Sequence, residues 1–227
     1  MKKLVRPLLL LFMSETTLGK FKEFLISLRE DLRKSRTVRL PQRLIHLGPP
    51  YKLNVGCAKN IKEDWINIDL LESADLVIDV RYGLPFDDDS CELIYSEHFL
   101  EHLEYPDESV PFLQACQRVL GPGGCIHIGV PDSRYVVESC LKDPIDPKFL
   151  NKVKTHKWGY PEYCQTGFEF INYHFRLNGQ HKFAFDYSTL KAQLERAGFR
   201  NVRERPFDPQ LDTLSRAEGT LYVMAEC

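Results

Sequence analysis

The sequence predicts an α/β domain built around a mostly parallel β-sheet, and three observations support this fold class. Short apolar runs alternate with helix-like segments between residues 51 and 227. The runs are almost continuously aliphatic or β-branched, which is typical of strands covered on both faces. Four of the runs end in a glycine or an acidic residue, and ligands bind at that edge of an open α/β sheet.

An N-terminal extension, residues 1–50, precedes the core domain, residues 51–227. A helix is predicted over residues 17–36, where apolar side chains recur at helical spacing: Phe21, Phe24, Leu25, Leu28 and Leu32. Before it, the apolar run 8–13 is too short to span a membrane and lacks a small-residue cleavage site. We therefore expect a cytoplasmic protein with at most a weak membrane-surface contact through its N-terminus.

In the first part of the core, five strands are predicted: Lys52–Val55, Trp65–Asp69, Leu76–Val80, Glu92–Ser96 and Cys125–Val130. A helix over Val110–Leu120 joins the last two and ends at Gly121-Pro122, because glycine and proline after a helix are stop signals. A second helix, Ser188–Ala197, precedes two further strands: Asn201–Arg205 and Thr220–Glu226.

Composition excludes some functional classes. The net charge of -2 provides no broad basic field, so we expect no nucleic-acid partner. The seven cysteines show no CxxC spacing, and a disulfide framework is not expected in a chain of 227 residues. Reduced thiols agree with a cytoplasmic location.

The strand ends carry the chemistry of a nucleotide-like ligand. Gly56 directly follows the first strand, where a missing Cβ lets a ligand approach the backbone. Asp69 ends the second strand and can accept hydrogen bonds from both hydroxyls of a ribose. Asp79, near the third strand end, can accept from an adenine amino group, and Glu97 ends the fourth strand. Taken singly, Gly56 and Asp69 are also explained by turns or a helix cap.

The motifs LNVGCAKN, WINIDL, ADLVIDV with LPF, LIYSEHFLEHL, RVLGPGG and IGVPD occur in this order. They resemble the class I S-adenosylmethionine-dependent methyltransferases, and most closely a bacterial type 11-like group often associated with glycan and cell-surface biosynthesis. The resemblance extends from Leu53 to the C-terminus. It implies a three-layer α/β/α Rossmann-like fold, a seven-stranded sheet with an antiparallel last strand, and S-adenosylmethionine as the cofactor.

The resemblance also implies roles for individual residues. The methionine part of the cofactor would lie against Gly56, Cys57 and Ala58, the ribose against Asp69 and Leu70, and the adenine against Asp79 and Val80. Glu97 and His98 would lie near the sulfonium and the acceptor. This chain departs from the family at Ala58 and Asn60, which stand where glycines are usual. Alanine with a positive φ costs about 1–2 kcal/mol, whereas asparagine tolerates that conformation.

A competing motif lies in residues 98–102. The string His98-Phe99-Leu100-Glu101-His102 matches the HxxEH pattern of inverted zinc proteases, in which both histidines bind zinc from one helix face. The preceding strand and the nucleotide-site context favour another explanation. We expect no metal, and expect His102 to pack in the core or to pair with a carboxylate.

The segment 133–187 is unusually aromatic, with 12 of the 26 aromatic residues of the chain in 55 positions. It lies between the fifth strand and the last helix, over the predicted cofactor site. Two interpretations stay open: a lid that binds the acceptor, or a small satellite core that holds the insertion together.

The expected function is O-methylation of a glycan or small hydroxyl-bearing metabolite. Histidine suits a general base near neutral pH, and His98 and His181 are the candidates, with Asp132 as a third option. Tyr173 and Asn172 could position the acceptor. One alternative is a non-catalytic module with the same fold. The other, an NAD(P)-dependent oxidoreductase, would require GxGxxG after the first strand and an acidic residue about 20 positions on.

Overall fold

The computed structural model describes residues 17, 20, 47–155 and 159–227. The chain divides into two units, Met1–Arg39 and Leu40–Cys227, and the second is described here. The predicted helix over 17–36, apart from Thr17 and Lys20, and the apolar run 8–13 lie outside the described residues. Within the described residues, every helix is too short or too polar to cross a membrane.

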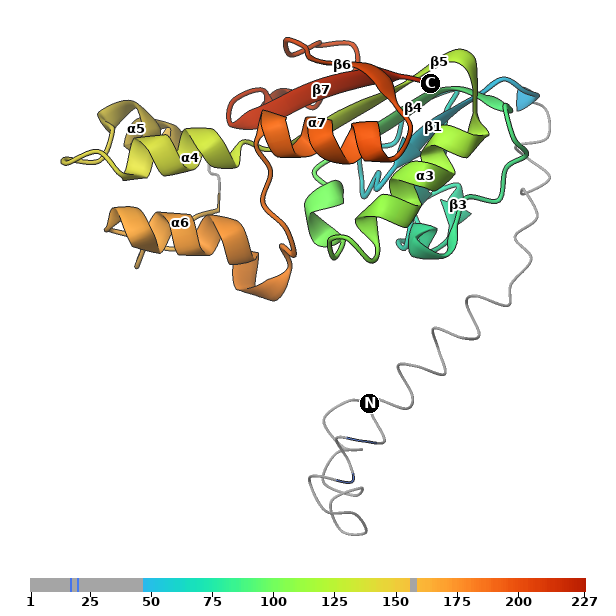
Figure 1. The fold of residues 1–227 in the computed structure, drawn as a ribbon. Helices are drawn as coiled ribbons and strands as arrows, with labels where there is room; N and C mark the ends of the chain where they lie inside the picture. The colour runs from blue at the N-terminus through green and yellow to red at the C-terminus, as the bar shows by residue number, and fades with distance from the viewer. Residues whose placement is uncertain (1–16, 18–19, 21–46, 156–158) are drawn as a thin grey trace. The chain divides into compact units, whose positions relative to one another are not determined.

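Seven strands form one sheet with the order β3-β2-β1-β4-β5-β7-β6 (Figure 1). They are β1 Tyr51–Val55, β2 Ile66–Asp69, β3 Leu76–Val77, β4 Cys91–Glu97, β5 Leu120–Pro131, β6 Arg200–Glu204 and β7 Thr220–Glu226. Strands β1 to β5 pair in parallel, and β7 runs antiparallel to both β5 and β6. The predicted seven-stranded sheet with an antiparallel last strand is confirmed.

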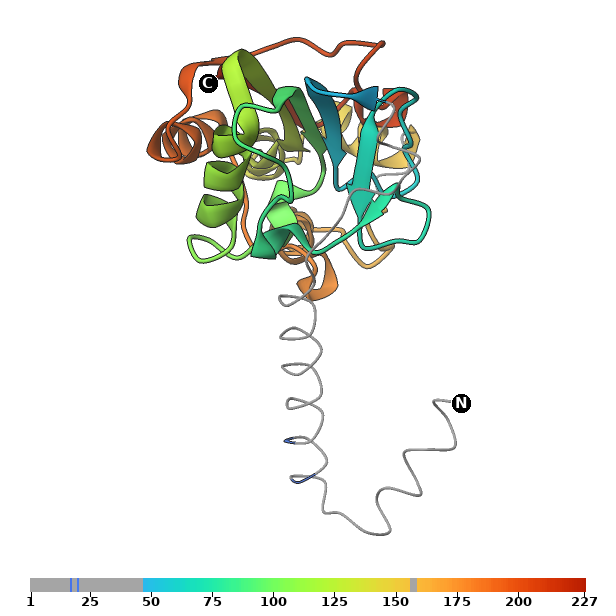
Figure 2. The ribbon, with the colours of Figure 1, turned by 90° about the vertical axis from the view of Figure 1, so that its right-hand side faces the viewer.

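Two helices, α3 Ser109–Val119 and α7 Tyr187–Arg196, cover the same face of the sheet (Figures 1 and 2). The strand register places Leu53, Ile66, Ile94 and Ile126 side by side on one sheet face, and all four are fully buried. Burial of such side chains is the main driving force for this layer.

The other sheet face is more polar and is covered by loops in the described part of the chain. Asn54, Asn67, Tyr95 and His127 lie side by side on it. Asn54 Nδ2 donates to Asn67 Oδ1 and to the Asn60 carbonyl, both at 2.8 Å. The Lys62 ammonium lies 4.5 Å from the centre of the Tyr95 ring. These polar side chains therefore hold the loops on the sheet.

The segment after β5 forms a satellite beyond the carboxyl end of that strand (Figure 1). It contains α4 Ser133–Cys140, α5 Pro147–Thr155 and α6 Gly167–Arg176. Its core consists of buried apolar side chains: Val136, Cys140, Phe149, Cys164, Phe170 and Ile171. Phe149 and Phe170 pack at right angles with ring centres 5.3 Å apart. The described residues of segment 133–187 therefore have a small apolar core of their own, and whether the segment also acts as a lid stays a prediction.

The third strand is shorter than the predicted Leu76–Val80. It ends at Val77, and a 3₁₀ turn, η2 Val80–Tyr82, follows. The Asp79 side chain accepts a hydrogen bond from the Arg81 backbone N–H and so caps this turn. A local side-chain bond to the backbone thus competes with continuation of the strand.

Candidate functional site

A cavity of about 250 Å³ opens at the carboxyl ends of the first strands. It is lined from successive strand ends by Gly56, Ile68, Asp69, Leu70, Ile78, Asp79, Val80, Arg81, Phe99, His102 and Leu103. The parallel strands bring together side chains that are up to 47 positions apart in the chain, from Gly56 to Leu103. The sheet edge predicted to bind a ligand therefore carries a cavity.

Gly56 turns the chain sharply at the end of β1. Its φ is +71°, and its N–H donates to the Ile68 carbonyl at 2.9 Å. A Cβ at this position would lie 2.5 Å from Phe99 Cβ. Glycine is needed here both for the backbone conformation and for the close approach of Phe99.

Asp69 fixes the loop that follows Gly56. Its Oδ2 accepts from the Ala58 N–H at 2.8 Å, and its Oδ1 accepts from the Leu71 N–H at 3.0 Å. Ala58 has a φ of +46°, so one of the two departures from the family glycines carries backbone strain. Each oxygen of the Asp69 carboxylate retains acceptor capacity for a ribose hydroxyl.

The Asp79 side chain, 4% exposed, is paired with Arg81 at the wall of the cavity. Its oxygens accept from Arg81 Nε at 2.9 Å and from an Arg81 terminal nitrogen at 2.7 Å. Arg81 also forms an ion pair with Glu108 at 2.8 Å. These two carboxylates raise the pKa of the Arg81 guanidinium, so the pair stays charged. Val80 is buried beside it.

Glu97, at the end of β4, lies outside this cavity. It is 4% exposed and does not line the cavity at the first strand ends. Its carboxylate accepts from Tyr222 Oη at 3.1 Å, from the Thr213 N–H at 3.2 Å and from Arg216 at 3.2 Å. Glu97 therefore attaches the segment before β7 to the end of β4.

Cys57 is buried beneath the loop. Burial and the nearby Asp69 charge raise the pKa of its thiol to about 12, so it stays protonated. Leu70, in contrast, is half exposed at the rim of the cavity.

These groups fit the predicted cofactor. The cavity offers a close backbone approach at Gly56, a carboxylate at Asp69 suited to ribose hydroxyls, and apolar walls suited to a flat base at Ile78, Val80 and Leu103.

A second cavity, of about 400 Å³, lies between the strand ends and the satellite. It is lined by His98, Pro131, Val136, Gly159, Tyr160, Tyr173, His174, Leu177, His181, Ser215, Arg216, Glu218 and Gly219. Both predicted histidines, His98 and His181, thus face one cavity, although 83 positions separate them. We call it the acceptor cavity.

His98 is held in a left-handed conformation with a φ of +53°. Its backbone N–H donates to the Gly129 carbonyl at 2.8 Å, and its Nε2 lies 2.8 Å from Thr220 Oγ1. Burial, with a smaller effect of the Arg216 charge, lowers the pKa of His98 to about 3. Its ring is therefore neutral at physiological pH.

His181 lies on the segment that returns from the satellite. Its Nδ1 lies 2.7 Å from the His174 carbonyl oxygen. Because a carbonyl only accepts, Nδ1 carries the proton and Nε2 carries the lone pair. Burial lowers the pKa of His181.

The remaining predicted acceptor residues are separated. Asp132 caps α4 by accepting from the Tyr135 N–H at 3.0 Å. Asn172 lines an outer groove of about 740 Å³ with Glu104, Tyr163, Glu169, Tyr173, Arg176, Asn178, Gly179, His181 and Lys182. Tyr173 and His181 line both this outer groove and the acceptor cavity.

Sequence reasoning missed the residues between β6 and β7. Ser215, Arg216, Glu218 and Gly219 line the acceptor cavity, yet no motif marks them. The one feature of the sequence that could have pointed to them is the length of the polar connection between the two predicted strands.

Comparisons with known proteins agree with the cavity at the strand ends. Residues 56–128 match the family described as a methyltransferase domain. No curated protein matches this chain.

Several solved structures are similar. An S-adenosylmethionine-dependent methyltransferase from Archaeoglobus fulgidus is 17% identical, with 89% of this chain and 99% of that chain covered and a TM-score of 0.49. One from Mesorhizobium loti is 17% identical, with 80% and 92% covered and a TM-score of 0.45. One from Methanosarcina mazei is 15% identical, with 83% and 98% covered and a TM-score of 0.47.

The matched segment begins at Gly56 and includes the strand ends that build the first cavity. The strand order and the antiparallel β7 agree with the fold that the sequence predicted. Residues 56–128 are thus the part of the chain that matches a methyltransferase domain, and S-adenosylmethionine is the cofactor that such a domain uses.

Proposed function

We propose that this enzyme methylates a hydroxyl oxygen of a glycan or of a related small hydroxyl-bearing metabolite. The observation that carries the proposal is the acceptor cavity, in which imidazole and phenol side chains surround a space of about 400 Å³. This cavity shares Tyr173 and His181 with the outer groove, so a larger acceptor can extend outward.

The cofactor is proposed to lie in the cavity at the strand ends. Gly56 would lie on its methionine side, Asp69 and Leu70 on its ribose side, and Asp79 and Val80 on its adenine side. Cys57 and Ala58, also assigned to the methionine side, follow Gly56 in the chain but do not line the cavity. Glu97 supports the neighbouring cavity by holding the Arg216 side chain.

The cofactor supplies a methyl group on a good leaving group, so the protein has to align the acceptor and remove its proton. His181 is the better proton acceptor of the two histidines, because its Nε2 lone pair is set by the bond from Nδ1 to His174. His98 has its Nε2 beside Thr220 and a pKa of about 3, which makes it a weak base. We assign His98 to positioning the acceptor oxygen.

The outer groove favours a sugar-like acceptor. Tyr163 is 61% exposed there and offers a ring on which the apolar face of a sugar can stack. Glu104, Arg176 and Lys182 add charged hydrogen-bonding groups around it. A rim of rings and polar groups is typical of sites that orient polar ligands.

The test is S-adenosylhomocysteine release with acceptor pairs that differ in one atom, such as a sugar and its amino-sugar counterpart. We expect turnover with the hydroxyl compound. We also expect His181→Ala to lower kcat by about 10²–10⁴-fold, the usual contribution of a positioned base.

His127→Gln, on the opposite sheet face, is the control. Methylation of amino compounds alone would refute the proposed acceptor class. Full turnover in both His98→Ala and His181→Ala would refute the assignment of the base.

A further inference from the structure

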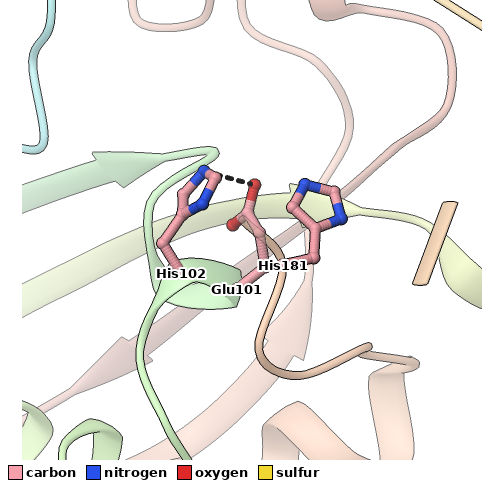
Figure 3. Close-up of side chains that lie close together, drawn as sticks. All are labelled: Glu101, His102 and His181. Atoms are coloured by element: carbon pink, nitrogen blue, oxygen red, sulfur yellow. Dashed lines mark ion pairs between the residues drawn. The ribbon is translucent and has the colours of Figure 1, made fainter. Parts of the chain in front are cut away.

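Three side chains from two distant parts of the chain, residues 101–102 and residue 181, converge between the two cavities. Glu101, His102 and His181 each offer one ligand atom, and these atoms all lie within 4.8 Å of one another. Figure 3 shows the two imidazoles on either side of the Glu101 carboxylate. His102 Nε2 lies 3.9 Å from Glu101 Oε1.

The Glu101 carboxylate is buried and receives no hydrogen bond from the described residues. Its side chain is 2% exposed, and its charged contacts are two histidine nitrogens, His98 Nδ1 and His102 Nε2, each 3.9 Å from Oε1. A buried, unpaired carboxylate is costly, so such groups are protonated, paired or bound to a cation.

Both histidines are oriented as metal ligands are. His102 Nδ1 lies 3.0 Å from the Gln180 carbonyl oxygen, and His181 Nδ1 lies 2.7 Å from the His174 carbonyl oxygen. Each carbonyl accepts a proton-bearing nitrogen, which leaves the Nε2 lone pair on both rings. Metal-binding histidines commonly donate their other N–H to a backbone carbonyl in this way.

The backbone also locks the convergence. The N–H groups of Lys182 and Phe183 donate to the Glu101 carbonyl at 2.8 and 3.3 Å. This bond pair joins the returning segment of the satellite to the turn η3 Leu100–His102. His181 is thus delivered to Glu101 by the main chain and not by a chance side-chain contact.

We infer that Glu101, His102 and His181 bind a divalent transition-metal ion, with Zn²⁺ as the best fit to two imidazoles and one carboxylate. Zinc ligands lie about 2.1 Å from the ion and so about 3.4 Å apart. The three side chains therefore have to move inward by about 1 Å, starting from separations of up to 4.8 Å. Three protein ligands leave a position open for an acceptor oxygen.

This inference replaces the pair suggested by the HxxEH string. His98 and His102 do not share a helix, because only Leu100–His102 is helical and His98 has a φ of +53°. The fold brings His181 to Glu101 as well, while His98 Nδ1 stays 3.9 Å from Glu101 Oε1 and its Nε2 lies 2.8 Å from Thr220 Oγ1. The expectation of no metal considered only residues 98–102, whereas His181 lies 80 positions after Glu101 in the chain.

The location gives the ion a role, which rests on the proposed function. His102 lines the cofactor cavity and His181 lines the acceptor cavity. A cation between them would bind the acceptor hydroxyl and lower its pKa. The His181 Nε2 lone pair would then hold the ion, and the ion would activate the hydroxyl in place of the histidine base. The hydroxyl proton would leave to solvent water as the oxygen takes the methyl group.

Metal binding is tested on the full chain after chelator treatment and dialysis. Calorimetry with Zn²⁺ and visible spectra with Co²⁺ report binding without any turnover. We expect one ion per chain and Co²⁺ d–d bands without a thiolate charge-transfer band. His181→Gln and Glu101→Gln should each weaken binding by more than about 100-fold, since changes to outer-shell partners already cost about 10–100-fold.

His127→Gln is the matched control, because it removes a histidine on the far sheet face and should change the affinity by less than about 2-fold. No bound ion, unchanged affinity in both ligand variants, or a thiolate band from the free cysteines would overturn the inference. Circular dichroism confirms the fold of each variant. His181→Gln carries the test if Glu101→Gln does not fold, since Glu101 is the buried member.

The acceptor assay separates this inference from the proposed function. Full hydroxyl methylation by the metal-free enzyme would overturn the role of the ion and leave the proposed function intact. Metal binding together with methylation of amines alone would overturn the proposed hydroxyl acceptor and leave the metal site intact.

Discussion

Replacing Gly56 by alanine tests the link between the strand-end geometry and the cavity proposed to bind the cofactor. The substitution adds one methyl group at a position with a φ of +71°. That methyl would lie 2.5 Å from both Phe99 Cβ and Phe99 Cγ. Because Cβ is fixed to the backbone, rotation of the Phe99 ring cannot remove the whole overlap.

Two energies add. A left-handed alanine costs about 1–2 kcal/mol. Forcing a methyl into a filled site costs about 1–3 kcal/mol more. We therefore expect Gly56→Ala to lower the free energy of unfolding by about 2–5 kcal/mol, or the Tm by about 4–20 °C for a domain of this size.

Gly123→Ala measures the first energy alone, so its difference from Gly56→Ala gives the second. Gly123 also has a positive φ, +81°, but a Cβ there meets no atom of the described residues within 4 Å. It should lose only the strain of about 1–2 kcal/mol. Urea denaturation measures the difference, and calorimetry with S-adenosylhomocysteine measures a loss of affinity in Gly56→Ala alone. Equal stability and equal affinity in the two variants would refute the argument from Phe99.

Other predictions follow from single contacts. Ala58→Gly should raise the free energy of unfolding by about 0.5–1 kcal/mol, because relief of the strain at a φ of +46° exceeds the added chain entropy; a loss of stability in urea would contradict this. Asp212→Asn should cost about 3–5 kcal/mol in the same assay, since it leaves Arg205, whose side chain is 8% exposed, without its buried partner at 2.6 Å; a change below 1 kcal/mol would count against it. Burial lowers the pKa of His127 to about 4. As the pH drops below about 6.5, the unfolded chain binds a proton at this histidine while the folded protein does not, so the free energy of unfolding decreases as the pH is lowered. His127→Gln should remove at most about 2 kcal/mol of the loss between pH 6.5 and 5, and an unchanged pH slope would refute the assignment.

Local signals predicted most elements of the core. The strand Thr220–Glu226 has the predicted limits, and α3 and α7 differ from the predicted helices by one residue at each end. The predicted end of β3 was wrong because the Asp79 side chain accepts a hydrogen bond from the Arg81 backbone and caps a turn there. The pattern of apolar residues does not indicate such a cap.

The candidate site was predictable in part, for a physical reason. Gly56, Asp69 and Asp79 follow strand ends, and parallel strands end at one edge, so their approach follows from the chain order. Glu97 also ends a strand, yet its side chain turns toward Tyr222 and Arg216 on the β7 side. The position of a residue along a strand does not determine which neighbour its side chain reaches.

By itself, the sequence determined the fold, the cofactor and the identity of the strand-end residues, because these depend on periodicity and on short motifs. Only the tertiary structure decided which residues meet across long separations. His181 joins Glu101 and His102 because backbone bonds from Lys182 and Phe183 close a loop of about 80 residues onto Glu101. Pairing at that distance depends on packing of the satellite, which no local pattern in the chain encodes.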